Sequence, residues 1–135
     1  MPKPPATATL NWDHALVFSA TSGSASLTID GDSRAGLSPV QALAISVAGC
    51  MAADVAHIVQ RGRYTLDAFR TDVVAERAQS EPHRFVRVTL RFFIKGAVPR
   101  ETVERAISLS REKYCSVWHS LREDITLSTT FQIHP

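Results

Sequence analysis

The sequence predicts an α+β fold in a single domain that spans residues 1–135, a length that suits one domain. Three observations predict this class. Apolar side chains at every second position fill the first third of the chain and return over residues 86–94, which is typical of strands. A long apolar segment over residues 39–59 repeats with helical spacing. A second helical pattern and a last alternating stretch follow, so strands and helices form a layered α+β arrangement.

The first third of the chain predicts short strands. Each carries apolar side chains that alternate with polar neighbours, and the turn-like residues 22–24 separate two of them. A polar loop over residues 31–36 ends this part. The alternating apolar residues are Leu10 and Trp12, Leu16 and Phe18, and Leu27 and Ile29.

The apolar segment predicts a long central helix. Ser38 is a favourable N-cap and Pro39 is tolerated at the first helical position. Gly62 is a natural stop. The charged Asp54 and the polar His57 interrupt the segment, so we expect a buried helix of a soluble protein and no membrane span. Residues at helical spacing on its apolar side are Val40, Leu43, Val47, Met51, Val55 and Ile58.

The second half predicts two longer strands, an amphipathic helix, a short helix and a final strand. The strand over residues 86–94 has apolar residues on one face and charged or polar residues on the other. Residues 98–109 have the pattern of a surface helix. A short helical segment is expected over residues 116–121, and the last strand over residues 127–133.

Composition and short motifs argue against several classes of function. The net charge of +2 is too small to predict nucleic-acid or membrane binding. The proline-rich N-terminus lacks the apolar core of a signal peptide, so a cytoplasmic location is expected. There, two cysteines are usually thiols, and a disulfide between them would be transient. Neither metal-binding spacings nor nucleotide-binding loops occur, so no metal or cofactor is expected.

Polar residues form one stripe along the central helix and allow two interpretations. The stripe either faces solvent or a partner subunit, or it carries chemistry at Cys50. A reactive cysteine needs a nearby cation or hydrogen-bond donors, and the helix itself does not supply them, which leaves Arg34 in the preceding loop as one candidate. The stripe consists of Ser46, Cys50, Asp54, His57 and Arg61.

The second cysteine, Cys115, also allows two interpretations. It precedes a predicted short helix, whose dipole favours a thiolate. A free cysteine is also often no more than a small buried hydrophobe. His119, four residues on, is able to face Cys115, although a single histidine there is more typical of packing or surface.

Two motifs stand out when the chain is taken as a whole. The first is Ser38-Pro39, an apolar run, Gly49-Cys50, Asp54-Val55 and Arg61; the second is Lys113-Tyr114-Cys115-Ser116-Val117. Together they resemble the OsmC/Ohr family, the osmotically inducible and organic-hydroperoxide-resistance proteins, and the pattern is similar to its divergent OsmC-like branch. Their order and the order of elements also match, so the resemblance covers nearly the whole chain.

The resemblance implies antiparallel sheets around a central buried helix in an intertwined homodimer. It also implies a thiol-dependent peroxidase that reduces organic hydroperoxides in oxidative stress defence. Cys50 would be the peroxidatic residue and Cys115 the resolving one. A sulfenic acid at the first would condense with the second to a disulfide, which an external dithiol reduces.

Two positions depart from the family pattern. Val40 stands where well-characterised members carry a glutamate that holds an arginine against the thiolate. Asp30 lies nearest the register of that arginine, and Arg34 substitutes for it only if the loop is arranged differently. Two further functions therefore stay open: a non-enzymatic dimer that binds an apolar small molecule, and a thiol redox sensor.

Overall fold

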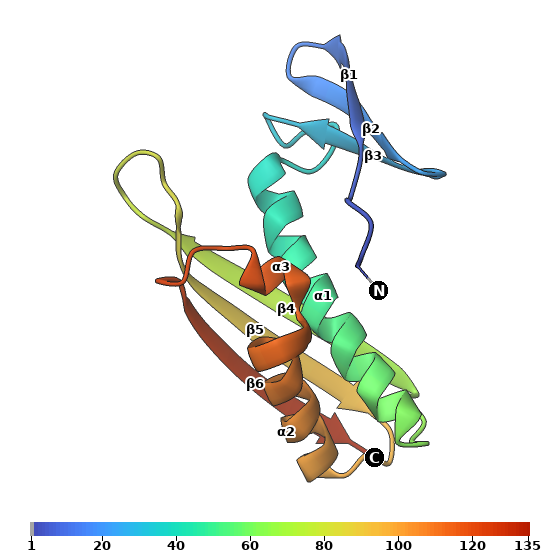
Figure 1. Ribbon diagram of the computed structural model, residues 1–135. Helices are drawn as coiled ribbons and strands as arrows, with labels where there is room; N and C mark the ends of the chain where they lie inside the picture. Colours follow the sequence, from blue (N-terminus) through green and yellow to red (C-terminus); the bar gives the residue numbers. More distant parts are fainter. Residues whose placement is uncertain (1) are drawn as a thin grey trace. The chain divides into compact units, whose positions relative to one another are not determined.

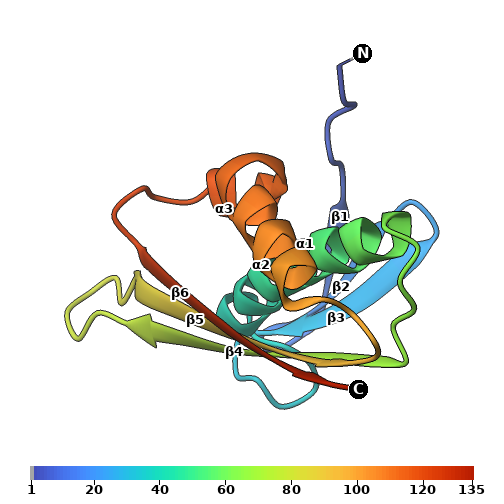
Figure 2. The ribbon, with the colours of Figure 1, turned by 90° about the horizontal axis from the view of Figure 1, so that it is seen from below.

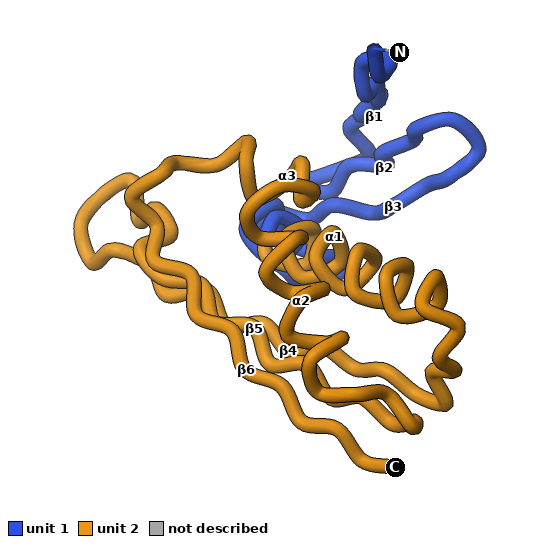
Figure 3. Tube along the Cα trace, turned by 60° about the horizontal axis from the view of Figure 1, so that its bottom comes forward, with its two compact units in different colours: residues 1–43 blue, residues 44–135 orange. Residues whose placement is uncertain are grey.

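The structure is a computed structural model that describes residues 2–135. The chain divides into two compact units, of which the first ends at Leu43 and the second runs from Ala44 to Pro135 (Figure 3). Helix α1 (Pro39–Arg61) carries the chain from the first unit into the second. The organisation of residues 1–135 as a single domain stays a prediction.

The first unit is a three-stranded antiparallel sheet. Its strands β1 (Thr9–His14), β2 (Val17–Ser22) and β3 (Ala25–Asp30) pair in chain order (Figure 1). These are the strands that the alternating pattern predicts. Half of their apolar side chains are exposed in the single chain, including Trp12 at 66%.

Helix α1 begins with reciprocal hydrogen bonds between Ser38 and Gln41. The Gln41 N–H donates to Ser38 Oγ at 3.1 Å, and the Ser38 N–H donates to Gln41 Oε1 at 2.9 Å. This is a capping box, which satisfies two backbone donors that the first helical turn leaves without partners. The predicted start at Ser38-Pro39 is confirmed.

The second unit contains a mixed sheet of three strands with helices on one face. Strands β4 (Ala68–Arg77), β5 (Phe85–Lys95) and β6 (Thr126–His134) form the sheet in that order. The part of α1 beyond residue 44 and helix α2 (Arg100–Leu109) lie on the same face of this sheet (Figures 1 and 2). Between α2 and β6 come the π-helical turn η1 (Ser110–Tyr114) and the short helix α3 (Ser116–His119).

The predicted α+β class is confirmed, but the expectation of wholly antiparallel sheets is wrong for one pairing. Strand β5 pairs antiparallel with β4 and parallel with β6. A parallel pair needs a crossover of a dozen residues or more, and α2, η1 and α3 supply it. Periodicity predicts which face of a strand is apolar, but not the direction in which the strand enters the sheet.

The core of the second unit lies between its sheet and the helices. Every second residue of β5 is buried there, and α1 contributes one face at four-residue spacing. The expectation of a buried helix therefore holds for one face of α1, while Ile45 is 49% exposed in the single chain. The fully buried side chains include Val47, Met51, Val55 and Val59 of α1, Val88, Leu90 and Phe92 of β5, and Val103 of α2.

Helix α1 is long and apolar enough to meet the criteria for a membrane span, with a mean hydropathy of 1.8. Core helices of soluble proteins meet the same criteria. The row of fully buried valine and methionine side chains along α1 is what a core helix needs, because a face that packs inside a domain must be apolar. We therefore interpret α1 as the core helix of a soluble protein.

Candidate active site

Cys50 lies in the middle of α1, within the second unit, and its side chain is half-buried. The preceding residue, Gly49, is exposed, and a Cβ atom built there would meet no atom within 4 Å. Space beside this turn of α1 is therefore open in the single chain.

Cys115 lies at the junction of η1 and α3 and is fully buried, with an exposed fraction of 0%. Its backbone N–H donates to the carbonyl oxygen of Ser110 at 2.9 Å. Its Sγ accepts the backbone N–H of Trp118 at 3.3 Å, so the cysteine serves as the N-cap of α3. Hydrogen bonds on both sides thus fix the position of this residue.

The fold brings the two cysteines together. Both are free thiols, and the Cys115 side chain is hydrogen-bonded to Cys50. Burial raises the pKa of the Cys115 thiol to about 12, and the hydrogen bond to Cys50 and the charge of Asp54 act in the same direction. The Trp118 N–H opposes this shift because it favours the thiolate. At neutral pH, Cys115 is therefore a thiol.

Asp54 and Ser110 form a second contact beside the cysteines. Ser110 is fully buried, and its Oγ donates to Asp54 Oδ2 at 2.7 Å. The predicted helix stripe includes Asp54, but the sequence gives no sign of Ser110. This serine follows an amphipathic helix among charged residues, which is a pattern typical of surface positions.

Arg34 lies in the loop after β3, in the first unit, and its side chain is exposed. Asp30 organises this loop. Its carboxylate accepts the backbone N–H groups of Asp32, Arg34 and Ala35 at 2.9, 3.1 and 2.8 Å, and these bonds lower the pKa of Asp30, most strongly the one from Ala35. The residue nearest the expected family arginine is thus a structural carboxylate. The proposed role of Arg34 at Cys50 stays a prediction.

Three other predicted polar residues are His119, His57 and Arg61. His119 donates from Nε2 to the carbonyl oxygen of Arg111 at 2.9 Å, so it packs α3 against η1. His57 and Arg61 are exposed near the end of α1. Within residues 2–135, no three histidine, cysteine or acidic side chains are grouped so as to hold a metal ion.

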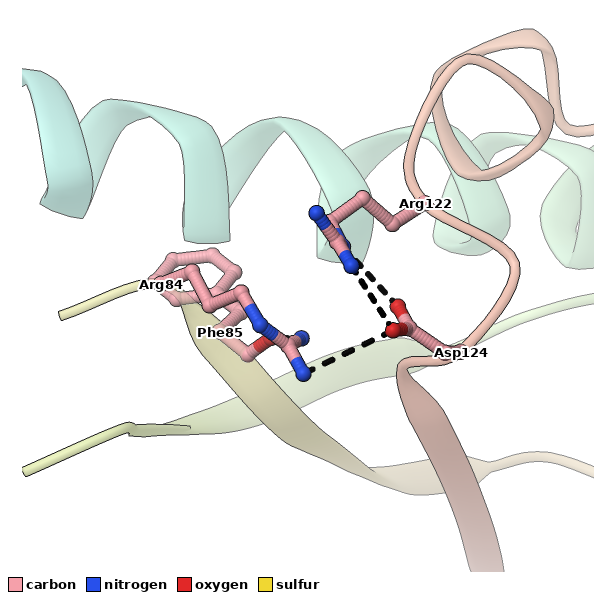
Figure 4. Close-up of polar contacts among 4 residues, drawn as sticks. All are labelled: Arg84, Phe85, Arg122 and Asp124. Carbon is pink, nitrogen blue, oxygen red and sulfur yellow. Dashed lines mark hydrogen bonds and ion pairs between the residues drawn. The ribbon is translucent and has the colours of Figure 1, made fainter. Parts of the chain in front are cut away.

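An ion-pair cluster holds the chain between α3 and β6. Arg122 donates to both carboxylate oxygens of Asp124, at 3.0 and 2.8 Å, and Arg84 lies 3.5 Å from the same carboxylate (Figure 4). Arg84 also donates to the carbonyl oxygen of Phe85 at 2.9 Å. The hydrogen bonds from Arg122 lower the pKa of Asp124 to about 2. The cluster thereby ties the segment that follows the Cys115 region to the start of β5.

A family profile described as OsmC-like protein matches residues 30–130, a range that includes both cysteines. The chain belongs to the OsmC family. Among its curated relatives, Protein YhfA of Escherichia coli K12 is 30% identical over 129 residues, which are 93% of this chain and 96% of YhfA.

Solved structures share the OsmC fold over nearly the whole chain. A hypothetical protein from Aquifex aeolicus VF5 has a TM-score of 0.89 at 22% identity and covers 97% of both chains. The organic hydroperoxide resistance protein OhrB of Bacillus subtilis has a TM-score of 0.60 at 16% identity, over 95% of this chain and 98% of OhrB. Identities this low show the fold alone. Together with the family match, the thiol pair indicates a redox or peroxide-related role for this OsmC protein.

Proposed function

We propose that this OsmC protein is a thiol-dependent peroxidase that reduces organic hydroperoxides through Cys50 and Cys115. The observation that carries the proposal is the asymmetry of the two hydrogen-bonded thiols. Cys50 is half-buried beside open space, while Cys115 is fully buried and stays protonated at neutral pH. Because the thiolate is the attacking species, Cys50 is the peroxidatic residue and Cys115 the resolving one.

The cycle has three steps. The Cys50 thiolate attacks the hydroperoxide, an S–O bond forms and the O–O bond breaks, and the alkoxide takes up a proton to leave as an alcohol. The Cys115 sulfur then attacks the Cys50 sulfenic acid, which forms the disulfide and releases water. An external dithiol reduces the disulfide by two exchange steps and is itself oxidised.

The surroundings of Cys50 favour an organic hydroperoxide over hydrogen peroxide. No charged side chain occurs from residue 47 to residue 53 of α1. OhrB, whose fold this chain shares, is named for resistance to organic hydroperoxides. We further propose that Arg34 supplies a positive charge to the Cys50 thiolate and that the protein works in the cytoplasm, where dithiol reductants are abundant.

The active form is proposed to be a homodimer. Large apolar side chains are exposed in both units of the single chain, among them Trp12 at 66% and Ile45 at 49%. Surfaces of this kind are usually covered by a partner. In the dimer, both units are proposed to work as one domain.

The test is turnover of cumene hydroperoxide with dithiothreitol as the reductant. The wild type should consume many equivalents of peroxide, and Cys50→Ser should consume none. Cys115→Ser should no longer form the intramolecular disulfide and should therefore lose turnover. Stoichiometric oxidation without cycling would instead identify a redox sensor. Activity retained in Cys50→Ser would overturn the proposal, and thiols that never react would favour the apolar-ligand dimer, detected by a ligand-dependent rise in Tm.

A further inference from the structure

Ser110 connects the two segments that carry the cysteines. Its Oγ donates to Asp54 Oδ2 at 2.7 Å, and Asp54 lies one helical turn beyond Cys50 on α1. Its carbonyl oxygen accepts the backbone N–H of Cys115 at 2.9 Å. One residue thus contacts the helix of the first cysteine and the backbone of the second.

The local geometry of η1 makes this double contact possible. The hydrogen bond from Cys115 to Ser110 spans five residues, which is the π-helical pattern, and such turns are frequent at functional sites. Ser110 is fully buried, so water does not satisfy its hydroxyl group. A buried hydroxyl without an acceptor is strongly disfavoured, and Asp54 is the acceptor on α1.

We propose that the Ser110–Asp54 hydrogen bond is a clasp that holds the Cys50 and Cys115 sulfur atoms in disulfide-forming geometry. Ser110 and Asp54 are then positioning residues of the resolving step, an inference that rests on the proposed function. In that step the S–S bond forms, the S–O bond of the sulfenic acid breaks, and water leaves. Neither Ser110 nor Asp54 enters the products.

Disulfide closure is sensitive to such a clasp. The bond tolerates only a narrow range of Cα separations and side-chain directions. The Cys50 and Cys115 segments belong to elements far apart in sequence, so their spacing depends on tertiary contacts. Loss of a positioning contact lowers the effective concentration of one reacting group at the other by large factors.

The first experiment separates the two oxidation steps after one equivalent of cumene hydroperoxide. Ser110→Ala and Asp54→Ala remove the clasp, whereas Asp54→Asn keeps an oxygen acceptor for the serine hydroxyl. Ser120→Ala is the matched control, because it removes an exposed hydroxyl that donates to Ser116 in the neighbouring helix. Dimedone trapping measures sulfenic acid at Cys50, and loss of both thiols measures disulfide closure.

The clasp predicts a specific pattern of rates. Closure should slow at least tenfold in Ser110→Ala and Asp54→Ala, while sulfenic acid formation stays within about twofold of the wild type. Asp54→Asn and Ser120→Ala should close within about threefold of the wild type. If Ser110→Ala does not fold, the closure rates of Asp54→Ala and Asp54→Asn are compared instead. An equal loss of closure rate in these two variants would overturn the clasp.

A second readout does not need peroxide. Equilibration with oxidised and reduced dithiothreitol gives the effective concentration of Cys115 toward Cys50, since the oxidised dithiol accepts the two electrons. We expect it to fall at least tenfold in Ser110→Ala and Asp54→Ala, and wild-type values there would overturn the clasp. A wild type that forms the disulfide in these buffers but ignores peroxide would refute the proposed function alone.

Discussion

Burial separates the chemistry of the two cysteines at the scale of single residues. Cys115 has no exposed surface and its pKa is raised to about 12, while Cys50 is half-buried at the edge of open space. A thiol that stays protonated does not attack a peroxide, but it is able to donate a hydrogen bond to its partner. In the second step, its proton leaves with the sulfenic oxygen as water while its sulfur bonds to Cys50.

The raised pKa of Cys115 predicts a loss of stability in alkali. In the unfolded chain the thiol ionises near its ordinary pKa of 9.0, whereas in the folded chain it stays protonated up to about 12. The unfolded state therefore binds fewer protons in this range, and the free energy of unfolding falls as the pH rises, by at most about 1.4 kcal/mol per pH unit.

Urea unfolding under reducing conditions, at several pH values from 7.5 to 10.5, measures this slope against Cys115→Ser. Serine does not titrate, so the variant removes the contribution of this thiol while other groups titrate as before. The wild type should lose stability faster than the variant above pH 9. Parallel curves would mean that Cys115 is not desolvated in the folded protein.

The sequence predicts some site residues and misses others, and the chemistry of each residue explains why. Cys50 and Cys115 stand out because cysteines are few and lie in family motifs. Ser110 does not, because its burial depends on Asp54, which is 56 residues away in sequence. An arginine partner for Cys50 is equally hard to predict, because Asp30 occupies the nearest register as the centre of a loop.

At the scale of elements, the start of α1 shows how local sequence determines structure. Ser38 and Gln41 bond to each other's backbone, and Gln41 Oε1 also accepts the hydroxyl of Ser33 at 2.7 Å. The start, the end near Gly62 and the strand positions could all be predicted from local signals. The parallel entry of β6 and the π-helical turn η1 could not, because both depend on how distant segments pack.

The capping box predicts a measurable contribution to stability. Ser38→Ala should lower the free energy of unfolding by about 1 kcal/mol, because the Gln41 N–H loses its acceptor. Ser38→Asp keeps an acceptor at the N-cap and should remain within about 0.5 kcal/mol of the wild type. Urea unfolding at pH 7 measures both variants. Equal destabilisation by alanine and aspartate would show that the side-chain oxygen does not cap α1.

At the scale of the whole molecule, the central helix α1 is not fully buried in a single chain, because some of its large apolar side chains are exposed. Ile45 of α1 is 49% exposed and Leu43 39%, although α1 has the composition of a core helix. A second copy of the chain is the partner that we propose, because it would bury the remaining apolar side of α1.

This proposal predicts that a charge on the exposed side of α1 weakens the dimer. Ile45→Glu should shift the protein from dimer to monomer in sedimentation velocity at micromolar concentration, since an unpaired carboxylate would have to be buried in the interface. Val74→Glu places the same charge on β4, at a position that is 57% exposed, so a dimer weakened by Ile45→Glu and not by Val74→Glu would assign the interface to α1. A dimer that is unchanged by Ile45→Glu would exclude this side of α1 from the interface.

The central claim is that Cys50 reacts first with peroxide and Cys115 closes the disulfide. Mass spectrometry after one equivalent of cumene hydroperoxide, in the wild type and in Cys115→Ser, tests it most directly. We predict rapid loss of both thiols in the wild type and a trapped sulfenic acid at Cys50 in the variant. Two thiols that survive untouched, or a sulfenic acid found at Cys115 in Cys50→Ser with wild-type speed, would contradict the account.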